Sequence, residues 1–180
     1  MAETPLAQMY QKEIVPQLME RFSYNNRMQT PRLEKVVVNC GVGTQHDREV
    51  LQEAADTVAL ITGQRPVITR ARKSISNFKL RAGMPVGVCV TLRREKMHNF
   101  LYRLINVVLP RVRDFRGVSG NAFDRHGNYT LGLSDQSVFT EINLDEAKYT
   151  IGMDINIVTS AKSDEEGKAL LALMGMPFAG

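Results

Sequence analysis

The chain has 180 residues, of which 43% are hydrophobic and 23% are charged, and this composition suits one soluble globular domain. No hydrophobic run approaches the roughly 18 residues of a membrane span, and the first residues lack the pattern of a secretory signal, so we expect neither a membrane protein nor a secreted one. The net charge of +4 is uneven, because residues 57–116 hold 13 Lys or Arg against 2 Asp or Glu, whereas both flanking segments are net acidic. This concentration of positive charge predicts a polyanionic partner.

The cysteines and histidines do not suggest a metal centre or a catalytic site. Cys40 and Cys89 lie in β-branched runs without a second Cys or His at metal-ligand spacing, so we interpret both as small buried side chains in a reducing cytosol. His46, His98 and His126 stand far apart, and no nucleophile has a base near it in sequence. We therefore expect no enzyme, no cofactor, no metal and no small-molecule substrate.

The first third of the chain predicts a helix, a strand and a second helix. Hydrophobic residues recur at three- and four-residue steps over residues 6–22, which predicts a helix that Pro16 bends. The β-branched run 33–40 predicts a strand. A further helical face covers residues 50–61 and stops at Gly63, a residue type favoured just after a helix.

The middle of the chain predicts two strands and the most regular helix. Residues 66–70 and 86–92 read as strands on either side of a long basic loop. Residues 97–108 place hydrophobic side chains on one helical face, and we expect Pro110 to end that helix.

The last third predicts strands at 128–133 and 152–161, followed by a helix. That helix starts with a capping box in which Ser163 and Glu166 each bind the other's backbone N–H. The order α, β, α, β, β, α, β, β, α favours an α+β fold. We expect a single mostly antiparallel sheet with helices on one face, in one RNA-binding domain over residues 1–180.

Hydrophobic and more polar residues alternate along three of the predicted strands. In the first, Val36 and Val38 point to one side, and Lys35 and Asn39 point to the other. A sheet buried on both faces would read as a continuous hydrophobic run instead. One face is therefore expected to be partly polar: either an ordinary solvated face or, because basic strand ends and loops border it, a binding face.

The segment 64–87 carries the sharpest functional signal. It contains no acidic residue, and its cations alternate with hydroxyl and amide side chains. Lys and Arg supply charge for phosphate, and the neutral polar side chains bind phosphate, ribose or base edges. We interpret the segment as a nucleic-acid contact rather than a merely solvated loop. Its candidate residues are Gln64, Arg65, Thr69, Arg70, Arg72, Lys73, Ser74, Asn77, Lys79 and Arg81.

Two features of this basic region each have two interpretations. Phe78 could stack on a base or prop the loop on its own domain. Arg111, Arg113 and Arg116 follow the most regular predicted helix. They could contact RNA, or they could have a structural or protein-facing role, since the helix dipole favours cations at a helix C-terminus.

Several stretches of the chain together resemble a known family. They are Pro-Arg-Leu-Glu-Lys-Val-Val-Val-Asn-Cys-Gly-Val-Gly at 31–43, the basic run at 63–81, and Gly-Met-Pro-Val-Gly at 83–87, continued at 109–117 and 152–162. These motifs closely resemble the bacterial members of the family of large-subunit ribosomal protein five, the universal family that binds 5S ribosomal RNA. The resemblance covers essentially residues 8–178.

The resemblance implies a fold similar to RNA-recognition folds. It also implies a structural, non-enzymatic protein of the central protuberance of the large ribosomal subunit, in the cytoplasm. Its implied partners are 5S ribosomal RNA, large-subunit ribosomal RNA and other 5S-associated ribosomal proteins. In the family the open sheet face and neighbouring loops hold the 5S RNA, and the RNP aromatic signature of base-stacking sheets is absent here. The expected ribosomal-RNA contacts are Lys35, Asn39, Gln64, Thr69 and Thr91, with the cations Arg65, Arg70 and Arg93 beside them.

The resemblance also implies two further contacts. The loop around residues 72–83 is expected to reach the peptidyl-site (P-site) transfer RNA through Arg72, Lys73, Ser74, Asn77, Phe78, Lys79 and Arg81. The region of Arg111, Arg113 and Arg116, with the loops after it, is expected to face a small-subunit head protein across an intersubunit bridge.

The chain departs from the family pattern at two loops. Arg125 and His126 stand where the family has Gly-Arg, and losing the glycine is expected to change the local turn, while Thr140 replaces a usual proline. Two other functional classes are kept as alternatives. An enzyme acting on RNA would need a carboxylate or histidine beside the basic loop, and a general DNA-binding module would bind duplex DNA and structured RNA similarly.

Overall fold

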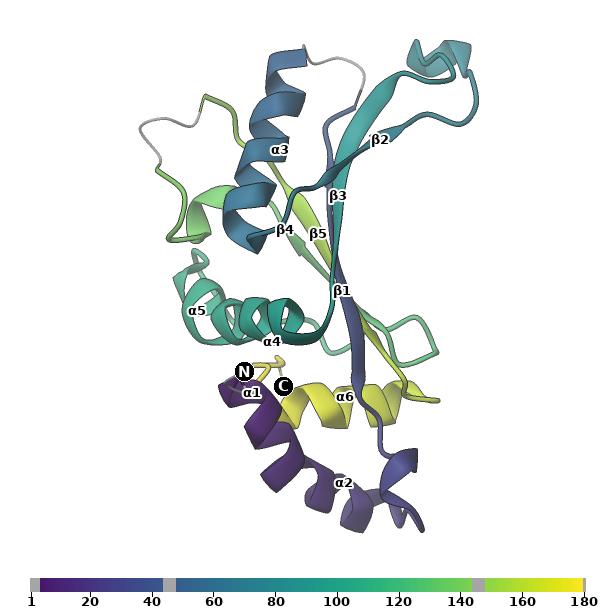
Figure 1. Ribbon diagram of the computed structural model, residues 1–180, viewed down its shortest axis with the longest axis vertical. Helices are drawn as coiled ribbons and strands as arrows, with labels where there is room; N and C mark the ends of the chain where they lie inside the picture. Colours follow the sequence, from purple (N-terminus) through teal and green to yellow (C-terminus); the bar gives the residue numbers. More distant parts are fainter. Residues whose placement is uncertain (1–3, 44–47, 144–147, 180) are drawn as a thin grey trace. The chain divides into compact units, whose positions relative to one another are not determined.

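The computed structural model describes residues 4–43, 48–143 and 148–179, and within these ranges the predicted order of helices and strands is confirmed (Figure 1). His46 lies outside the described residues. The helices are α1 Pro5–Met9, α2 Val15–Phe22, α3 Arg48–Thr62, α4 Arg94–Arg103, α5 Leu109–Arg111 and α6 Asp164–Leu173. The strands are β1 Leu33–Gly41, β2 Val67–Arg70, β3 Pro85–Leu92, β4 Tyr129–Leu133 and β5 Met153–Thr159.

The strands form one five-stranded antiparallel open sheet in the order β2-β3-β1-β5-β4, which confirms the predicted α+β class. The fold divides into two compact units. Unit 1 comprises Met1–Val36, Arg93–Leu131 and Asn156–Gly180, and unit 2 comprises Val37–Leu92 and Gly132–Ile155. That the whole chain acts as one RNA-binding domain stays a prediction.

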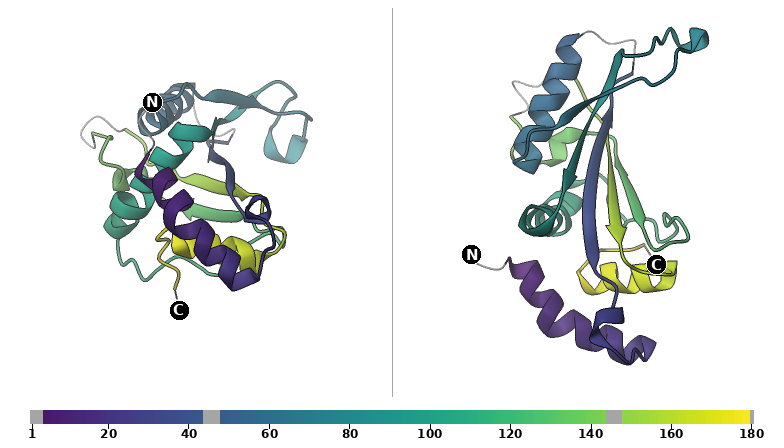
Figure 2. Two further views of the ribbon diagram at one scale, coloured as in Figure 1. Left: turned by 60° about the horizontal axis from the view of Figure 1, so that its bottom comes forward. Right: turned by 45° about the vertical axis from the view of Figure 1, so that its right-hand side comes forward.

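Each unit has its own hydrophobic core. In unit 2, α3 packs against β3, and the predicted helical face with Ala54, Val58 and Ile61 is buried, as is Val88 of β3. In Figure 2 (right), α3 lies along one side of the strands of this unit. In unit 1 the core includes Leu18, Phe100, Leu101, Leu104, Tyr129, Ile157 and Leu170. None of the described helices is both long and hydrophobic enough to cross a bilayer.

A wider helical turn precedes a proline in two helices. A π-helical turn, Tyr10–Ile14, separates α1 from α2, and another, Leu104–Val108, separates α4 from α5. Pro16 and Pro110 each lie two residues after the last residue of such a turn. Proline offers no N–H and crowds the carbonyl four residues earlier, and a wider turn relieves that conflict. The helix ends at Arg111, one residue after Pro110, which agrees to within one residue with the expectation that Pro110 ends it.

The capping box of α6 is confirmed on one side only. The Ser163 hydroxyl accepts from the backbone N–H of Glu166 at 3.4 Å. The Glu166 carboxylate, however, accepts from the N–H of Lys162 at 2.8 Å rather than from that of Ser163. The Glu166 carboxylate therefore binds the residue just before the N-cap. The side chains of Ser163 and Glu166 still both accept backbone hydrogen bonds at the start of the helix.

Two left-handed glycines should respond differently to alanine. Gly127 has φ +73°, and a Cβ there would lie 2.5 Å from the Ala161 Cβ and 2.9 Å from the Ser163 carbonyl oxygen. Gly63 has φ +62°, and a Cβ added there would have no neighbouring atom within 4 Å. We expect Gly63→Ala to cost about 1–2 kcal/mol of backbone strain, and Gly127→Ala to cost about 1–3 kcal/mol more because of overpacking.

Denaturant unfolding of the two variants and the wild-type protein measures this difference. Equal losses in the two variants would contradict the close packing at Gly127.

Candidate nucleic-acid interface

Burial alternates along the strands as the sequence predicts and leaves one face of the sheet partly exposed. On β1, Val36, Val38 and Cys40 are fully buried, whereas Lys35 and Asn39 are half-buried. On β5, Met153, Ile155 and Ile157 alternate with exposed or half-buried residues. We call this less buried side of the strands the open face. Since neighbouring strands share one buried side, their outward residues lie on the same open face.

In unit 2 the pairing of β2 with β3 brings predicted residues together on the open face. The strands are antiparallel, with Val67 opposite Cys89 and Thr69 opposite Gly87. The register shifts between Thr69 and Arg70, so the ladder is irregular where the strands lead into the basic loop. A Cβ on Gly87 would lie only 2.5 Å from the carbonyl oxygen of Cys40, so glycine permits this close approach of β3 to β1.

A hollow of about 370 Å³ lies on this part of the open face. Hydrogen-bonding side chains and partly exposed hydrophobic ones line it together, which suits a base or sugar edge. The predicted residues Gln64, Arg65, Thr69 and Thr91 all line it. Sequence reasoning missed three further lining residues, Val67, Cys89 and Val90. The alternation of the strands could have indicated Cys89, which shares a side of β3 with Thr91.

The polar groups around the hollow are only partly used within the protein. The Gln64 side-chain amide donates to the Thr91 carbonyl oxygen at 3.2 Å, which ties the start of β2 to β3. Thr91 itself is exposed. Asn39, on the neighbouring strand β1, makes no side-chain hydrogen bond to any described residue, so its amide is available to a ligand.

The expected long basic loop is a folded hairpin, which we call the basic hairpin (residues 71–84). The Ala71 N–H donates to the Met84 carbonyl, and nearer the tip Ile75 and Leu80 exchange two backbone hydrogen bonds of 2.9 and 3.0 Å. The Ser74 hydroxyl accepts from the Ala82 N–H at 2.9 Å. The hairpin extends beyond the ends of β2 and β3 (Figure 1).

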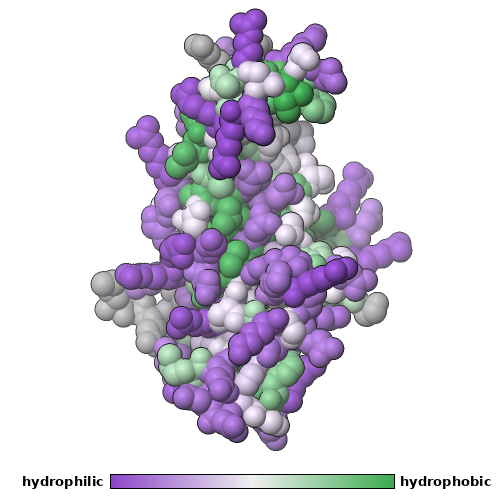
Figure 3. All heavy atoms as spheres, turned by 90° about the vertical axis from the view of Figure 1, so that its right-hand side faces the viewer, coloured by the Kyte–Doolittle hydropathy of each residue, from purple (hydrophilic) through white to green (hydrophobic). Residues whose placement is uncertain are grey.

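The cations of this region are exposed and lack acidic partners among the described residues. Arg70 donates to the Gly83 carbonyl oxygen at 3.1 Å, which braces the base of the basic hairpin. In Figure 3, hydrophilic side chains predominate around the hairpin, and hydrophobic side chains form a strip below it. The exposed cations whose side chains make no hydrogen bond or ion pair inside the described structure are Arg65, Arg72, Lys73, Lys79 and Arg81.

Phe78 lies in the short 3₁₀ turn Ser76–Phe78 at the tip of the basic hairpin. Its side chain is 69% exposed, which is more than a ring that props the loop on its domain would show. The exposure favours the stacking interpretation. Asn77, beside it, is exposed as well.

Other predicted residues fall in unit 1 and are not part of the hollow. Lys35 and Arg93 adjoin the unit boundaries in sequence. Arg111, Arg113 and Arg116 are exposed at and after the end of α5, and their side chains make no hydrogen bond to the described residues. These arginines are therefore not explained by hydrogen bonds to the last carbonyl groups of the helix. An RNA contact and a structural or protein-facing role both stay open.

Unit 1 also contains a polar pair on the open face that the candidate residues omitted. The Thr130 hydroxyl on β4 donates to the Asn156 side-chain oxygen on β5 at 2.8 Å. This bond turns the Asn156 amide N–H groups away from Thr130. The alternation of β5 already placed Asn156 on the polar side, but its role could not be seen without its cross-strand neighbour.

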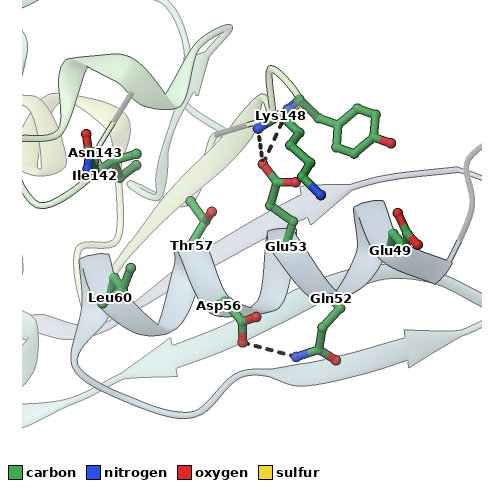
Figure 4. Close-up of a pocket in the computed structure, with 10 residues that line it drawn as sticks. Glu49, Gln52, Glu53, Asp56, Thr57, Leu60, Ile142, Asn143 and Lys148 are labelled. Carbon is green, nitrogen blue, oxygen red and sulfur yellow. Dashed lines mark hydrogen bonds between the residues drawn. The ribbon is translucent and has the colours of Figure 1, made fainter. Parts of the chain in front are cut away.

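An acidic hollow of about 480 Å³ lies beside α3 in unit 2 (Figure 4). Glu49, Glu53 and Asp56 line it from one face of that helix. Glu53 accepts from the backbone N–H groups of Lys148 and Tyr149 at 2.8 and 3.3 Å. Three carboxylates repel phosphate, so this hollow is unsuited to RNA and the open face is the better candidate.

The loop departures have small local effects. Arg125, at the position of the family glycine, has φ +69°, so the turn keeps a left-handed residue without glycine. Asp124 holds the turn by accepting from the N–H groups of His126 and Asn128 and from the Asn128 amide, and the Asn128 bond lowers the pKa of the Asp124 carboxyl. Thr140 is exposed, and its hydroxyl donates to Glu141.

The sequence matches known families over most of its length. Residues 85–178 match a family model described as ribosomal L5P family C-terminus, and residues 26–81 match one described as Ribosomal protein L5. The "Large ribosomal subunit protein uL5" of Caldanaerobacter subterraneus subsp. tengcongensis is 60% identical over 97% of this chain and 98% of its own length. The protein of the same name from Geotalea uraniireducens is 59% identical over 96% of this chain and 97% of its own length. The one from Thermotoga maritima is 57% identical over 97% of this chain and 95% of its own length.

The two thiols should differ in reactivity, because the expectation that both are buried is wrong for Cys89. Cys40 is fully buried, and burial, with Asp154 and Cys89 nearby, raises the pKa of its thiol to about 11. Cys89 is partly exposed, and partial burial raises its pKa as well. Since the thiolate reacts, we expect iodoacetamide at pH 8 to modify Cys89 slowly and Cys40 only after unfolding.

Mass spectrometry of labelled peptides measures both rates, and a Cys40→Ala variant assigns the signal. Equal labelling of the two thiols in the folded protein would contradict this placement of Cys89.

Proposed function

Because the chain belongs to the ribosomal protein L5 family, a family of non-enzymatic structural components of the large ribosomal subunit, we propose that its open face and basic hairpin bind ribosomal RNA, with 5S ribosomal RNA preferred. The main support for the proposal is that two features of unit 2 lie next to each other. A hydrogen-bonding hollow lies on β2 and β3, and the exposed, acid-free basic hairpin continues from the same strands.

The two features have different tasks. The unpaired cations of the basic hairpin, such as Arg72 and Lys73, supply electrostatic affinity for phosphates, which carries little sequence information. Asn39, Gln64 and Thr91 present neutral donors and acceptors on the open face, and these fix the register of a particular RNA. Affinity and selectivity are thus separable by mutation.

The remaining contacts extend this proposal. The basic hairpin reaches the P-site transfer RNA, which its projection beyond the strands supports. Arg111, Arg113 and Arg116 face a small-subunit head protein across an intersubunit bridge, and their exposure and lack of internal partners support an external contact. Large-subunit ribosomal RNA and other 5S-associated proteins complete the set of partners.

Binding of the purified protein to 5S RNA across a salt series tests the proposal, with transfer RNA and duplex DNA of equal length as competitors. If roughly five to eight phosphates are neutralised, log K falls with log salt at a slope of about −0.7 to −0.9 per phosphate. We expect 5S RNA to be retained selectively at physiological salt. Equal, salt-sensitive binding to all three nucleic acids would reject the 5S assignment and leave a general polyanion-binding module.

Two substitutions separate affinity from selectivity. Arg72→Ala removes one exposed cation, so it should weaken binding to all RNAs and reduce the salt slope by about one. Asn39→Ala should reduce the preference for 5S RNA with little change in slope. Lys12→Ala, which removes an exposed cation in the N-terminal helical region, is the matched control. A slope in Arg72→Ala equal to that of wild type, or unchanged discrimination in Asn39→Ala, would contradict the assigned roles.

Phe78 offers a test of the basic hairpin tip. Base stacking on an aromatic ring is worth about 1–3 kcal/mol per base, so Phe78→Ala should weaken RNA binding roughly 5- to 150-fold. A thermal melt shows whether the free protein also loses stability. Loss of stability with unchanged RNA affinity would restore the interpretation of Phe78 as a prop.

A further inference from the structure

An acidic residue stands on the open face where RNA is proposed to bind. Asp154 on β5 is exposed, and the residues on either side of it, Met153 and Ile155, are buried in the core. Its side chain therefore points to the open face. Strand β5 adjoins β1, where Asn39 faces the same side, and both residues belong to unit 2.

The Asp154 carboxylate is unengaged within the described structure. It makes no hydrogen bond or ion pair with any described residue. On the neighbouring strand β4, Gly132 has no side chain to cover it: a Cβ there would lie 3.6 Å from an Asp154 carboxylate oxygen. The carboxylate is thus open to a ligand from the side of β4 as well as from above the sheet.

A carboxylate at this place restricts how a polyanion can lie. A phosphate about 4 Å away would be repelled by about 1 kcal/mol in bulk water and about 4 kcal/mol at the effective dielectric constant of a protein surface. An ionised carboxylate can only accept hydrogen bonds. The RNA groups that gain from it are therefore the donors, namely the amino groups of bases and the ribose 2′-hydroxyl.

We propose that Asp154 is a specificity-determining residue of the RNA site, accepting a hydrogen bond from a base amino group or a ribose 2′-hydroxyl. The inference rests on the proposed binding of RNA at the open face. Asp154 disfavours every position of the RNA along the open face that brings a phosphate to β5. It stabilises the position that brings a hydrogen-bond donor there. It thereby complements Asn39, whose amide can both donate and accept.

Asp154→Asn tests this role, because it keeps the shape of the side chain and removes the charge. We expect about tenfold weaker binding to 5S RNA, the scale of one lost charge-assisted hydrogen bond, and unchanged or tighter binding to duplex DNA. Asp56→Asn is the matched control. It removes the same charge from α3, where Asp56 accepts from Gln52, and should not weaken binding to either nucleic acid.

The donor is identified with two kinds of modified RNA. In the first kind, guanosine, adenosine or cytidine is replaced in turn by inosine, purine riboside or zebularine, which lack the amino group, and the second kind carries 2′-deoxyribose. The tenfold difference between wild type and Asp154→Asn should disappear with the RNA that lacks the donor. A thermal melt checks that the variant is folded, and Asp154→Ser replaces it if it is not.

The outcomes separate this inference from the proposed function. If wild type prefers 5S RNA but Asp154→Asn binds it equally or more tightly, as Asp56→Asn should, the role of Asp154 is overturned and the carboxylate is merely solvated. If the tenfold difference persists with all of these modified RNAs, neither a base amino group nor a 2′-hydroxyl is bound and the proposal is also overturned. If wild type shows no preference for 5S RNA, the proposed function itself fails.

Discussion

The one-sided burial of the sheet is the constraint on which the rest of the structure depends. Hydrophobic side chains at every second position fix which side of each strand meets the core, as Val36 and Val38 do on β1. The outward positions are thereby free for polar residues, and Asn39 occupies one of them. A slip of one residue in any strand would bury those polar groups and expose the core, so the open face and the core are specified by the same pattern.

The charges of unit 2 follow the same division. Its helix α3 carries Glu49, Glu53 and Asp56 beside one hollow, whereas the cations gather on the basic hairpin and around the other. A polyanion approaching this unit is thus attracted to one region and repelled from another. In the proposed complex, these charges would orient the RNA before any specific contact forms, and the neutral side chains of the open face would then select one register of the RNA.

The sequence predicts local periodic features well and non-local ones poorly. Strand positions, the helix stop at Gly63 and the open face follow from patterns of two and of three to four residues, and the structure confirms them. The backbone pairing of Ile75 with Leu80 and the hydrogen bond between Gln64 and Thr91 depend on partners that no local pattern identifies. The prolines show the same limit, because Pro110 predicts where its helix ends but not that the preceding turn, Leu104–Val108, widens into a π turn.

The position of β2 at the end of the sheet has a consequence for the protein before it meets RNA. An edge strand presents unpaired backbone groups that can template pairing with another chain, and here Val67 and Ile68 are 69% and 39% exposed on it. Arg65 and Arg70 border those two residues, and like charges on two copies repel. The arginines proposed to hold RNA therefore also act as gatekeepers against edge-to-edge aggregation of newly made chains, a protection that weakens as salt rises.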